Sequence, residues 1–466
     1  MQSDPATGQT PSADALIYGL DDRPDPFKAL LAAAQHVLAS IVGIVTPTLI
    51  IGGTLGLGVH LPYLISMSLI VSGVATFIQS RRIGPVGSGL LSLQGTSFAF
   101  LGAILAAGFA VKNAGGTPED ILAMIFGLCL AGCVIEIGLS QVLRYLDRII
   151  TPTVTGVLIT VIGLSLIKVG FTDLAGGVGS ETFGSPLNLA LGGFVVAVII
   201  ALNFQPNTNV RISAVLIGLV AGLVVAVPFG LIDFSALARQ PLIAVPLPMK
   251  YGFDFDLGLF LPIAFIYLIT AIETTGDLTA NSVIAGEPVK GETYLTRIRG
   301  GVLGDGVNSG IAALFNTFPN TTFSQNNGVI QLTGIASRHL AFYIAPLLIL
   351  LGLFPVFGAL FTLIPKPVLG GATLVLFGSI AVAGIRILST VVIDRKRIFV
   401  MAVSFGLGLG VTLVPDAVSQ LPDLVRNVAS SPITTAGLTA IVLTLVLPEP
   451  KVVTEAGPAD DLITEA

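Results

Sequence analysis

The sequence predicts an all-α integral membrane protein, and three observations support this: composition, long apolar segments and the distribution of basic residues. Of the 466 residues, 53% are hydrophobic and only 11% are charged, with a mean hydropathy of +0.93. Soluble proteins carry about 25% charged residues, so this chain has too few charges to cover a water-exposed surface. Its high hydrophobicity excludes intrinsic disorder. The net charge of −5, without a basic block, argues against a nucleic-acid partner.

The apolar residues form fourteen segments, each close to the ~20 residues that a membrane-spanning helix needs. No segment has the alternating polarity of an outer-membrane barrel strand. We therefore expect helical spans at 28–52, 60–80, 85–110, 120–143, 150–168, 187–204, 211–234, 258–284, 299–317, 320–337, 340–363, 367–390, 397–414 and 431–448. Residues 1–27 and 449–466 are expected to be short disordered tails in the cytoplasm.

Lys and Arg predict the orientation, because cytoplasmic loops are enriched in them. With the N-terminus inside and fourteen alternating spans, 16 of the 22 basic residues lie in the cytoplasm and 6 lie outside. This bias predicts a multi-pass protein of the cell (inner) membrane with both termini in the cytoplasm. The lipid bilayer is expected to surround its spans.

Fourteen spans divide into seven plus seven, and an odd number per half requires the two halves to be inverted. The third and tenth spans, which correspond to one another, are both interrupted. The third has Gly84, Pro85 and Gly87 before SLQGTSFAF, and the tenth has Pro319 before NTTFSQNNG. Paired interruptions of this kind are a pointer to the binding site of a transporter.

Polar residues inside the apolar segments gather in a few spans. Glu273 and Asp277 lie four residues apart on one helix face in the eighth span. The ninth span has Asp305, the tenth has Gln325, and the first has His36. An ionisable group in a span costs about 2.5–3.5 kcal/mol on insertion scales, so it usually has a task. We expect one domain to hold substrate and the other to be a smoother apolar wall.

Each of these residues also has a structural interpretation. Asp277 would be solvated at the membrane face, Asp305 would cap or bridge helices, and His36 would be a packing residue. For Glu136, in the fourth span, a lipid-headgroup or interhelix contact fits better than a functional role. Cys129 and Cys133 are expected to be small packing residues, because no His or Cys cluster completes a metal site.

The stretch from Gln325 to Gly334, QNNGVIQLTG, resembles the signature Q-N-x-G-x-x-x-x-T of the nucleobase–ascorbate transporter family. The similarity extends along most of the chain: QH in the first span, GTSFAF in the third, ITPTVTG opening the fifth, ETTGD in the eighth and GGVLGDG in the ninth.

The resemblance implies a seven-plus-seven inverted repeat with core and gate domains. The core comprises 28–143 (spans one to four) and 258–363 (spans eight to eleven), and the gate comprises 150–234 (spans five to seven) and 367–448 (spans twelve to fourteen). Short β-strands are implied in the third and tenth spans. Family members act as homodimers through the gate and move substrate by an elevator-like displacement of the core.

The resemblance also assigns roles to individual positions. It implies that Glu273 and Gln325 bind the substrate through side chains, and that Phe98 and Ser324 bind it through the backbone, beside Ser97. The residues implied to support the site or to couple protons are His36, Asp277, Asp305, Asn326 and the signature positions Gly328 and Thr333, together with Glu273.

The chemistry of these side chains fits a purine dione. A carboxylate accepts from ring N–H groups, and the Gln amide offers one acceptor and two donors. A carboxyl group in a low-dielectric site can take up a proton, so Glu273 is expected to couple transport to the proton gradient.

In the family, Gln at the first signature position accompanies xanthine and uric acid, while uracil carriers tend to have Glu. Ser97 stands where some strict xanthine carriers have Asn. We therefore expect proton-coupled symport of xanthine, uric acid or both, without a cofactor or metal. The alternatives are a carrier of uracil or another nucleobase, and a sodium-coupled purine carrier. An enzyme is not expected, because the histidines at 36, 60 and 339 form no nucleophile–base pair or metal cluster.

Overall fold

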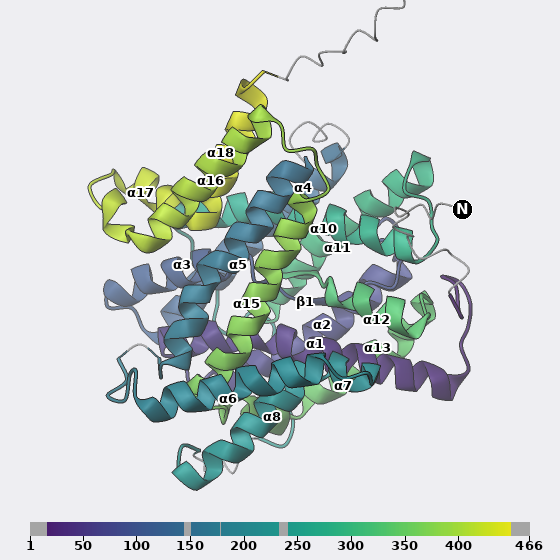
Figure 1. Cartoon of the computed structure of the whole chain (residues 1–466), viewed down its shortest axis with the longest axis horizontal. Helices are drawn as coiled ribbons and strands as arrows, with labels where there is room; N and C mark the ends of the chain where they lie inside the picture. Colours follow the sequence, from purple (N-terminus) through teal and green to yellow (C-terminus); the bar gives the residue numbers. More distant parts are fainter. Residues whose placement is uncertain (1–15, 144–150, 178, 233–240, 449–466) are drawn as a thin grey trace, which may run out of the picture.

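The computed structural model describes residues 16–143, 151–177, 179–232 and 241–448, which are almost entirely helical (Figure 1). The helices are α1 (Pro26–Leu55), α2 (Leu61–Arg81), α3 (Leu101–Asn113), α4 (Pro118–Val142), α5 (Pro152–Leu174), α6 (Pro186–Asn203), α7 (Thr208–Ile212), α8 (Ala214–Ala226), η3 (Val227–Phe229), α10 (Leu257–Ile284), α11 (Gly291–Leu314), α12 (Gln325–Thr333), η4 (Arg338–Leu340), α13 (Ala341–Leu353), α14 (Pro355–Thr362), α15 (Lys366–Leu388), α16 (Arg395–Leu413), η5 (Pro415–Val418), α17 (Asp423–Ala429) and α18 (Pro432–Val446).

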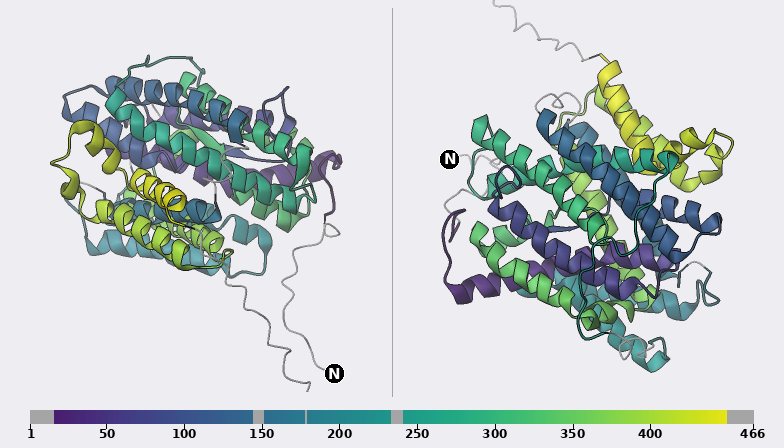
Figure 2. Two further views of the ribbon diagram at one scale, coloured as in Figure 1. Left: turned by 90° about the horizontal axis from the view of Figure 1, so that it is seen from above. Right: turned by 180° about the vertical axis from the view of Figure 1, so that it is seen from behind.

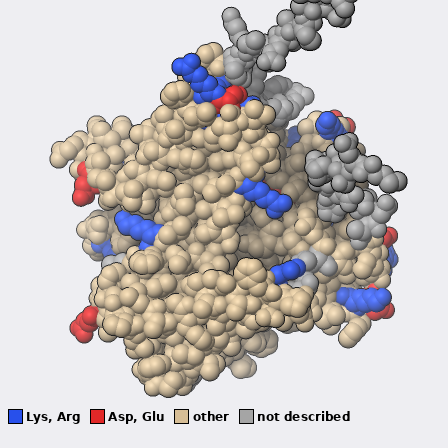
Figure 3. Space-filling model, in the orientation of Figure 1, with Lys and Arg blue, Asp and Glu red and all other residues tan. Residues whose placement is uncertain are grey.

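Within the described residues, eight helices are long and apolar enough to cross a membrane: α1, α2, α4, α5, α6, α10, α15 and α16. A ninth candidate is the pair Arg338–Leu353 and Pro355–Thr362, whose axes meet at 74°. Three shorter apolar helices accompany them: Leu101–Asn113, Ala214–Phe229 and Pro432–Val446. Charged residues are few and scattered over the face in Figure 3. The chain is therefore a multi-pass membrane protein.

The largest departures from continuous spans lie at three of the expected segments. Segments 85–110 and 320–337 each contain a short strand followed by a short helix, α3 or α12, rather than one long helix. Segment 340–363 bends between α13 and α14 at Phe354, whose backbone is extended. Pro355 explains that bend, because proline disfavours the helical conformation in the residue before it.

The two strands pair with each other although they lie more than 220 residues apart in the sequence. Strands β1 (Gln94–Thr96) and β2 (Asn320–Thr322) are antiparallel, with Gly95 opposite Thr321. The pair is fully buried, and α1, α2, α10 and α11 pack against it. Buried β-strands are tolerated at this depth because each satisfies the backbone groups of the other.

Gly95 and Gly43 leave room for the ring of Phe323. A Cβ on Gly95 would lie 2.4 Å from Phe323 Cζ, and one on Gly43 would lie 2.9 Å from Phe323 Cε2. The ring therefore lies between α1 and β1, in space that a side chain on Gly43 or Gly95 would occupy. This packing fixes β2, and with it the start of α12, against α1.

The helices pack in two groups. In one, α11 lies along α4 and α13 along α2; in the other, α5 lies along α15 and α16 along α18. The left panel of Figure 2 shows the yellow α18 set apart from the purple α1 and α2. Gly163 explains the close approach of α5 and α15, since a Cβ there would lie 2.3 Å from the Ala381 nitrogen.

Residues 16–25 are not a disordered tail. The Tyr18 backbone pairs with Ile335 as an isolated parallel bridge, and Arg338 N–H donates to the Leu20 carbonyl at 3.0 Å. The expectation of disorder is wrong here because hydrogen bonds to the segment after α12 order this polar stretch, and its composition gave no sign of them. The rest of the predicted N-terminal tail and residues 449–466 lie outside the described residues.

Candidate functional site

Two helix N-termini flank the strand pair, and neither carries a side-chain cap. Helix α3 follows β1 through Ser97 and Phe98, and α12 follows β2 through Phe323 and Ser324. In the described part of the chain, the N–H groups of Phe98 and Ser324 donate to no acceptor. Uncapped N–H groups and the positive end of the helix dipole favour a carbonyl oxygen or an anion.

Asp305 on α11 connects four elements. Its carboxylate accepts hydrogen bonds from Gln79 Nε2 on α2 at 3.1 Å, from the Thr322 N–H on β2 at 3.3 Å, and from the hydroxyls of Thr274 on α10 and Thr321. The side chain is completely buried. Because its donors come from α2, α10 and β2, Asp305 orders the surroundings of the strand pair.

Asp277, a residue of α10, lies beside the start of α12. Its two oxygens accept from the hydroxyls of Ser324 at 2.8 Å and Thr322 at 3.1 Å, and its own carbonyl accepts from Asn327 Nδ2 at 3.3 Å. The sequence left open a solvated position for Asp277 at the membrane face. These hydrogen bonds instead attach its carboxylate and carbonyl to Thr322, Ser324 and Asn327. Glu273, one turn earlier on α10, has no hydrogen-bond partner among the described residues. Its carboxylate is therefore free to bind a ligand.

His36 and Asn326 are fully buried beside one another. The Asn326 amide donates to the Leu91 carbonyl at 2.6 Å, while its oxygen and both ring nitrogens of His36 have no partner in the described residues. The side chain of Gln94 on β1 is likewise buried and unpaired. Unpaired buried polar groups are costly and point to a ligand, a water or a second conformation.

Gln325 lines a cavity of about 320 Å³ whose other lining residues come from α1, α6, α7, α8, α12 and α15. Gly328, one turn along α12, lines the same cavity, together with Val42 and Gly43 of α1 and Arg211 of α7. Ligand cavities have volumes of about 300–1,000 Å³, so a small planar molecule fits. Phe98, near the N-terminus of α3, contacts Phe377 of α15 edge-on, with ring centroids 5.7 Å apart.

Of the predicted site residues, Gln325 and Gly328 line this cavity, whereas Glu273, Phe98, Ser324 and the supporting residues are outside its lining. Ser97 and Thr333 are also outside it. Ser97 is buried, and its hydroxyl accepts from the Ala99 N–H at 3.3 Å. The Thr333 hydroxyl donates to the Val329 carbonyl at 2.9 Å, at the opposite end of α12 from Gln325. Thr333 therefore closes the helix rather than facing the cavity.

Sequence reasoning did not find the partners of the carboxylates. Gln79 and Thr274 donate to Asp305, but an isolated Gln or Thr in a span gives no sign of a contact made far along the chain. Glu136 is completely buried and accepts from Thr270 Oγ1 at 3.0 Å. The interhelix interpretation of Glu136 holds, and a lipid-headgroup contact is excluded by its burial.

Away from the strand pair in sequence, the loop before α10 holds a cationic and aromatic cluster. Lys250 Nζ lies 3.8 Å from the ring centroid of Tyr63 and 5.1 Å from that of Tyr251. Burial lowers the pKa of the Lys250 amino group and raises the pKa of the Tyr251 hydroxyl. The Tyr251 hydroxyl hydrogen-bonds His60, which pairs with Glu119 at 3.0 Å. The cluster ties this loop to α2 and α4.

Comparison with known proteins assigns the chain to a family. The model of a permease family (Xan_ur_permease) matches residues 27–417. The xanthine permease XanP of Escherichia coli is 47% identical over 442 residues, covering 94% of this chain and 95% of the relative. The chain belongs to the nucleobase–ascorbate transporter family. The resemblance inferred from the signature is thereby confirmed.

A second Escherichia coli member of this family, the xanthine permease XanQ, is 44% identical over 437 residues, covering 93% of this chain and 94% of the relative. The family and both relatives are permeases, so this chain is a transporter and not an enzyme.

The fold is shared with more distant transporters. The transmembrane domain of the cyanobacterial bicarbonate transporter BicA has a TM-score of 0.58 at 16% identity, covering 88% of this chain and 99% of that one. Among the described residues of this family member, no three His, Cys, Asp or Glu side chains are placed to hold a metal ion.

Proposed function

We propose that the protein takes up oxidised purines, xanthine and/or uric acid, in symport with protons. The observation that carries the proposal is Gln325, exposed in a cavity of about 320 Å³ at the uncapped start of α12. The names of the XanP and XanQ relatives support xanthine as the substrate.

The recognition chemistry follows from the donors and acceptors near that position. A purine dione has planar N–H donors and C=O acceptors. The Gln325 amide offers both kinds of group to one edge of the base, and Glu273 accepts from a ring N–H. The free N–H groups of Phe98 and Ser324 would donate to the carbonyl oxygens. His36, Asn326, Asp277 and Asp305 would hold these groups in position.

Proton coupling is assigned to Glu273. Its carboxyl group has no hydrogen-bond partner among the described residues, so proton uptake breaks no existing bond there. Proton uptake removes the charge of this partly buried group and creates one donor, and both changes alter the affinity for a base. Symport would follow if the protonated carboxyl binds the base, through its carbonyl oxygen as acceptor and its hydroxyl as donor, so that proton and purine move together.

We further propose fourteen spans in a seven-plus-seven inverted repeat. The core would comprise 28–143 and 258–363, and the gate 150–234 and 367–448. The protein would lie in the inner membrane, with residues 1–27 and 449–466 as cytoplasmic tails. The separate packing of α5, α15, α16 and α18 supports an elevator-like displacement of the core against the gate. A homodimer formed through the gate would hold that domain fixed in the bilayer.

Uptake of labelled xanthine in cells expressing the chain tests the substrate assignment. Unlabelled xanthine and uric acid should compete, while uracil and hypoxanthine should compete weakly. Strong competition by uracil alone would favour the pyrimidine alternative. Uptake that needs sodium and survives a protonophore would favour sodium coupling.

A further inference from the structure

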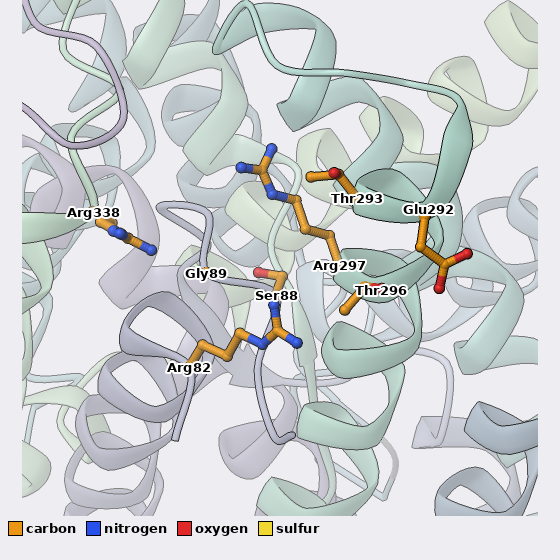
Figure 4. A pocket seen from close by; sticks show the side chains of 8 residues that line it. All are labelled: Arg82, Ser88, Gly89, Glu292, Thr293, Thr296, Arg297 and Arg338. Carbon is orange, nitrogen blue, oxygen red and sulfur yellow. The ribbon is translucent and has the colours of Figure 1, made fainter. Parts of the chain in front are cut away.

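A second cavity of about 300 Å³ lies outside the site described above, at the end of α2 (Figure 4). The residues that line it include Arg82, Arg297, Arg338, Glu292, Thr293 and Thr296. The arginines come from three separate segments: the turn after α2, helix α11 and η4. In Figure 4 their side chains surround the turn at Ser88 and Gly89, whereas the Glu292 carboxylate points away from Arg82 and Arg338.

The arginines keep free donors despite two ion pairs. Arg297 Nη1 binds Glu287 at 2.6 Å, and Arg338 Nη2 binds Asp21, which is largely exposed. Each pair occupies one guanidinium nitrogen. Arg338 Nε is buried without a partner among the described residues, and within them the guanidinium group of Arg82 makes no hydrogen bond or ion pair. Several N–H groups therefore remain available for one anion.

The walls of the cavity suit an anion as well. The first turn of α11 carries no side-chain cap, so its N–H groups and the hydroxyls of Thr293 and Thr296 add donors. Gly87 and Gly89 have positive φ values of 101° and 74°, which glycine adopts without strain. The Gly87 N–H donates to the Gly300 carbonyl at 2.7 Å and holds the turn against α11.

We propose that this three-arginine cavity binds a phosphate group, either inorganic phosphate or the headgroup of an anionic phospholipid. The planar forks of several guanidinium groups match the oxygens of one phosphate. Bound phosphate would hold together α2, α11 and the segment after α12. Helices α2 and α11 carry Gln79 and Asp305, and the third segment follows the helix that begins at Gln325, so the ligand stabilises the framework of the transport site without entering it.

Thermal unfolding of the purified chain in detergent, with sodium phosphate against sodium chloride at equal ionic strength, tests the soluble ligand. Nanodiscs of phosphatidylglycerol against phosphatidylcholine test the headgroup. The variant is R82Q/R338Q. The matched control, R386Q/R395Q, removes two exposed arginines from α15 and α16 and leaves the cavity intact.

We expect a saturable rise in Tm with one of the two ligands, kept by the control and weakened about tenfold in R82Q/R338Q, where bidentate bonds are lost. A rise with phosphate identifies the soluble anion, and a rise with phosphatidylglycerol alone identifies the lipid. If R82Q/R338Q does not fold, R82K/R338K keeps the charge and loses the forks, and the same weakening is expected. Equal responses of parent and arginine variant to both ligands would overturn the proposal. Labelled xanthine uptake is a separate readout, so this proposal and the transport function fail independently.

Discussion

Gln79 near the end of α2 donates a hydrogen bond of 3.1 Å to Asp305 on α11, a residue 226 positions further along the chain. The same amide nitrogen donates to the Gly301 carbonyl at 3.1 Å, and its oxygen accepts from the Ser88 N–H at 3.3 Å. Gln79 thus links the carboxylate beside the strand pair to the glycine-rich turn at the arginine cavity.

Asp305→Asn should destabilise the protein. The new amide group would face the donors Gln79 Nε2 and the Thr322 N–H, leaving at least one of them unpaired. An unpaired buried donor costs about 1–3 kcal/mol, so Tm in detergent should fall by several degrees. The exposed Asp416→Asn is the control and should leave Tm unchanged. An Asp305→Asn protein as stable as the parent would show that Asp305 does not hold these elements together.

Glu273→Gln should insert and bind substrate but should not accumulate it. Gln keeps the shape and hydrogen-bonding capacity of the side chain and cannot take up a proton. Counterflow of labelled xanthine should persist in proteoliposomes, while uptake driven by a pH gradient should stop. Glu181→Gln, in an exposed loop, should keep both activities. A Glu273→Gln protein that still concentrates xanthine would assign the coupling to another group.

Gln325→Glu should weaken binding of xanthine and uric acid by about tenfold or more, which corresponds to at least 1.4 kcal/mol. The change removes the amide donors and leaves an acceptor facing a carbonyl of the base. Binding constants of the purified protein provide the measurement. Gln331→Glu changes an exposed residue of the same helix outside the cavity and should bind normally. Unchanged constants in Gln325→Glu would mean that the base does not contact this side chain.

Ser97→Asn should penalise uric acid more than xanthine. Uric acid carries an oxygen at C8 where xanthine has hydrogen, and Asn adds bulk and a polar group beside Phe98. A polar mismatch discriminates more strongly than the loss of a methylene. The readout is the ratio of uric acid to xanthine uptake efficiency at matched surface expression. Ser97→Ala removes the bond to the Ala99 N–H without adding bulk, which separates the two effects. A level or rising ratio in Ser97→Asn would place Ser97 away from C8.

The sequence predicts the membrane class, the two interrupted segments and the carboxylates, because each leaves a local signal. Glycine, proline and β-prone residues mark the breaks, and charges stand out against apolar spans. The partners of Asp305 leave no such signal, since Gln79 looks like any polar residue near a helix end. The pairing of Tyr18 with Ile335 also leaves no signal in the sequence, because it depends on backbone hydrogen bonds between distant segments. The bend at Phe354 could have been predicted from Pro355.

The central claim is proton-coupled purine transport, and the most direct test uses proteoliposomes containing only the purified chain. An inward proton gradient should drive labelled xanthine above its external concentration, and a protonophore should abolish that accumulation. An inward sodium gradient at constant pH should drive none. Accumulation driven by sodium alone would contradict proton coupling. The absence of xanthine movement under either gradient would contradict the assignment of the cavity at Gln325 to purines.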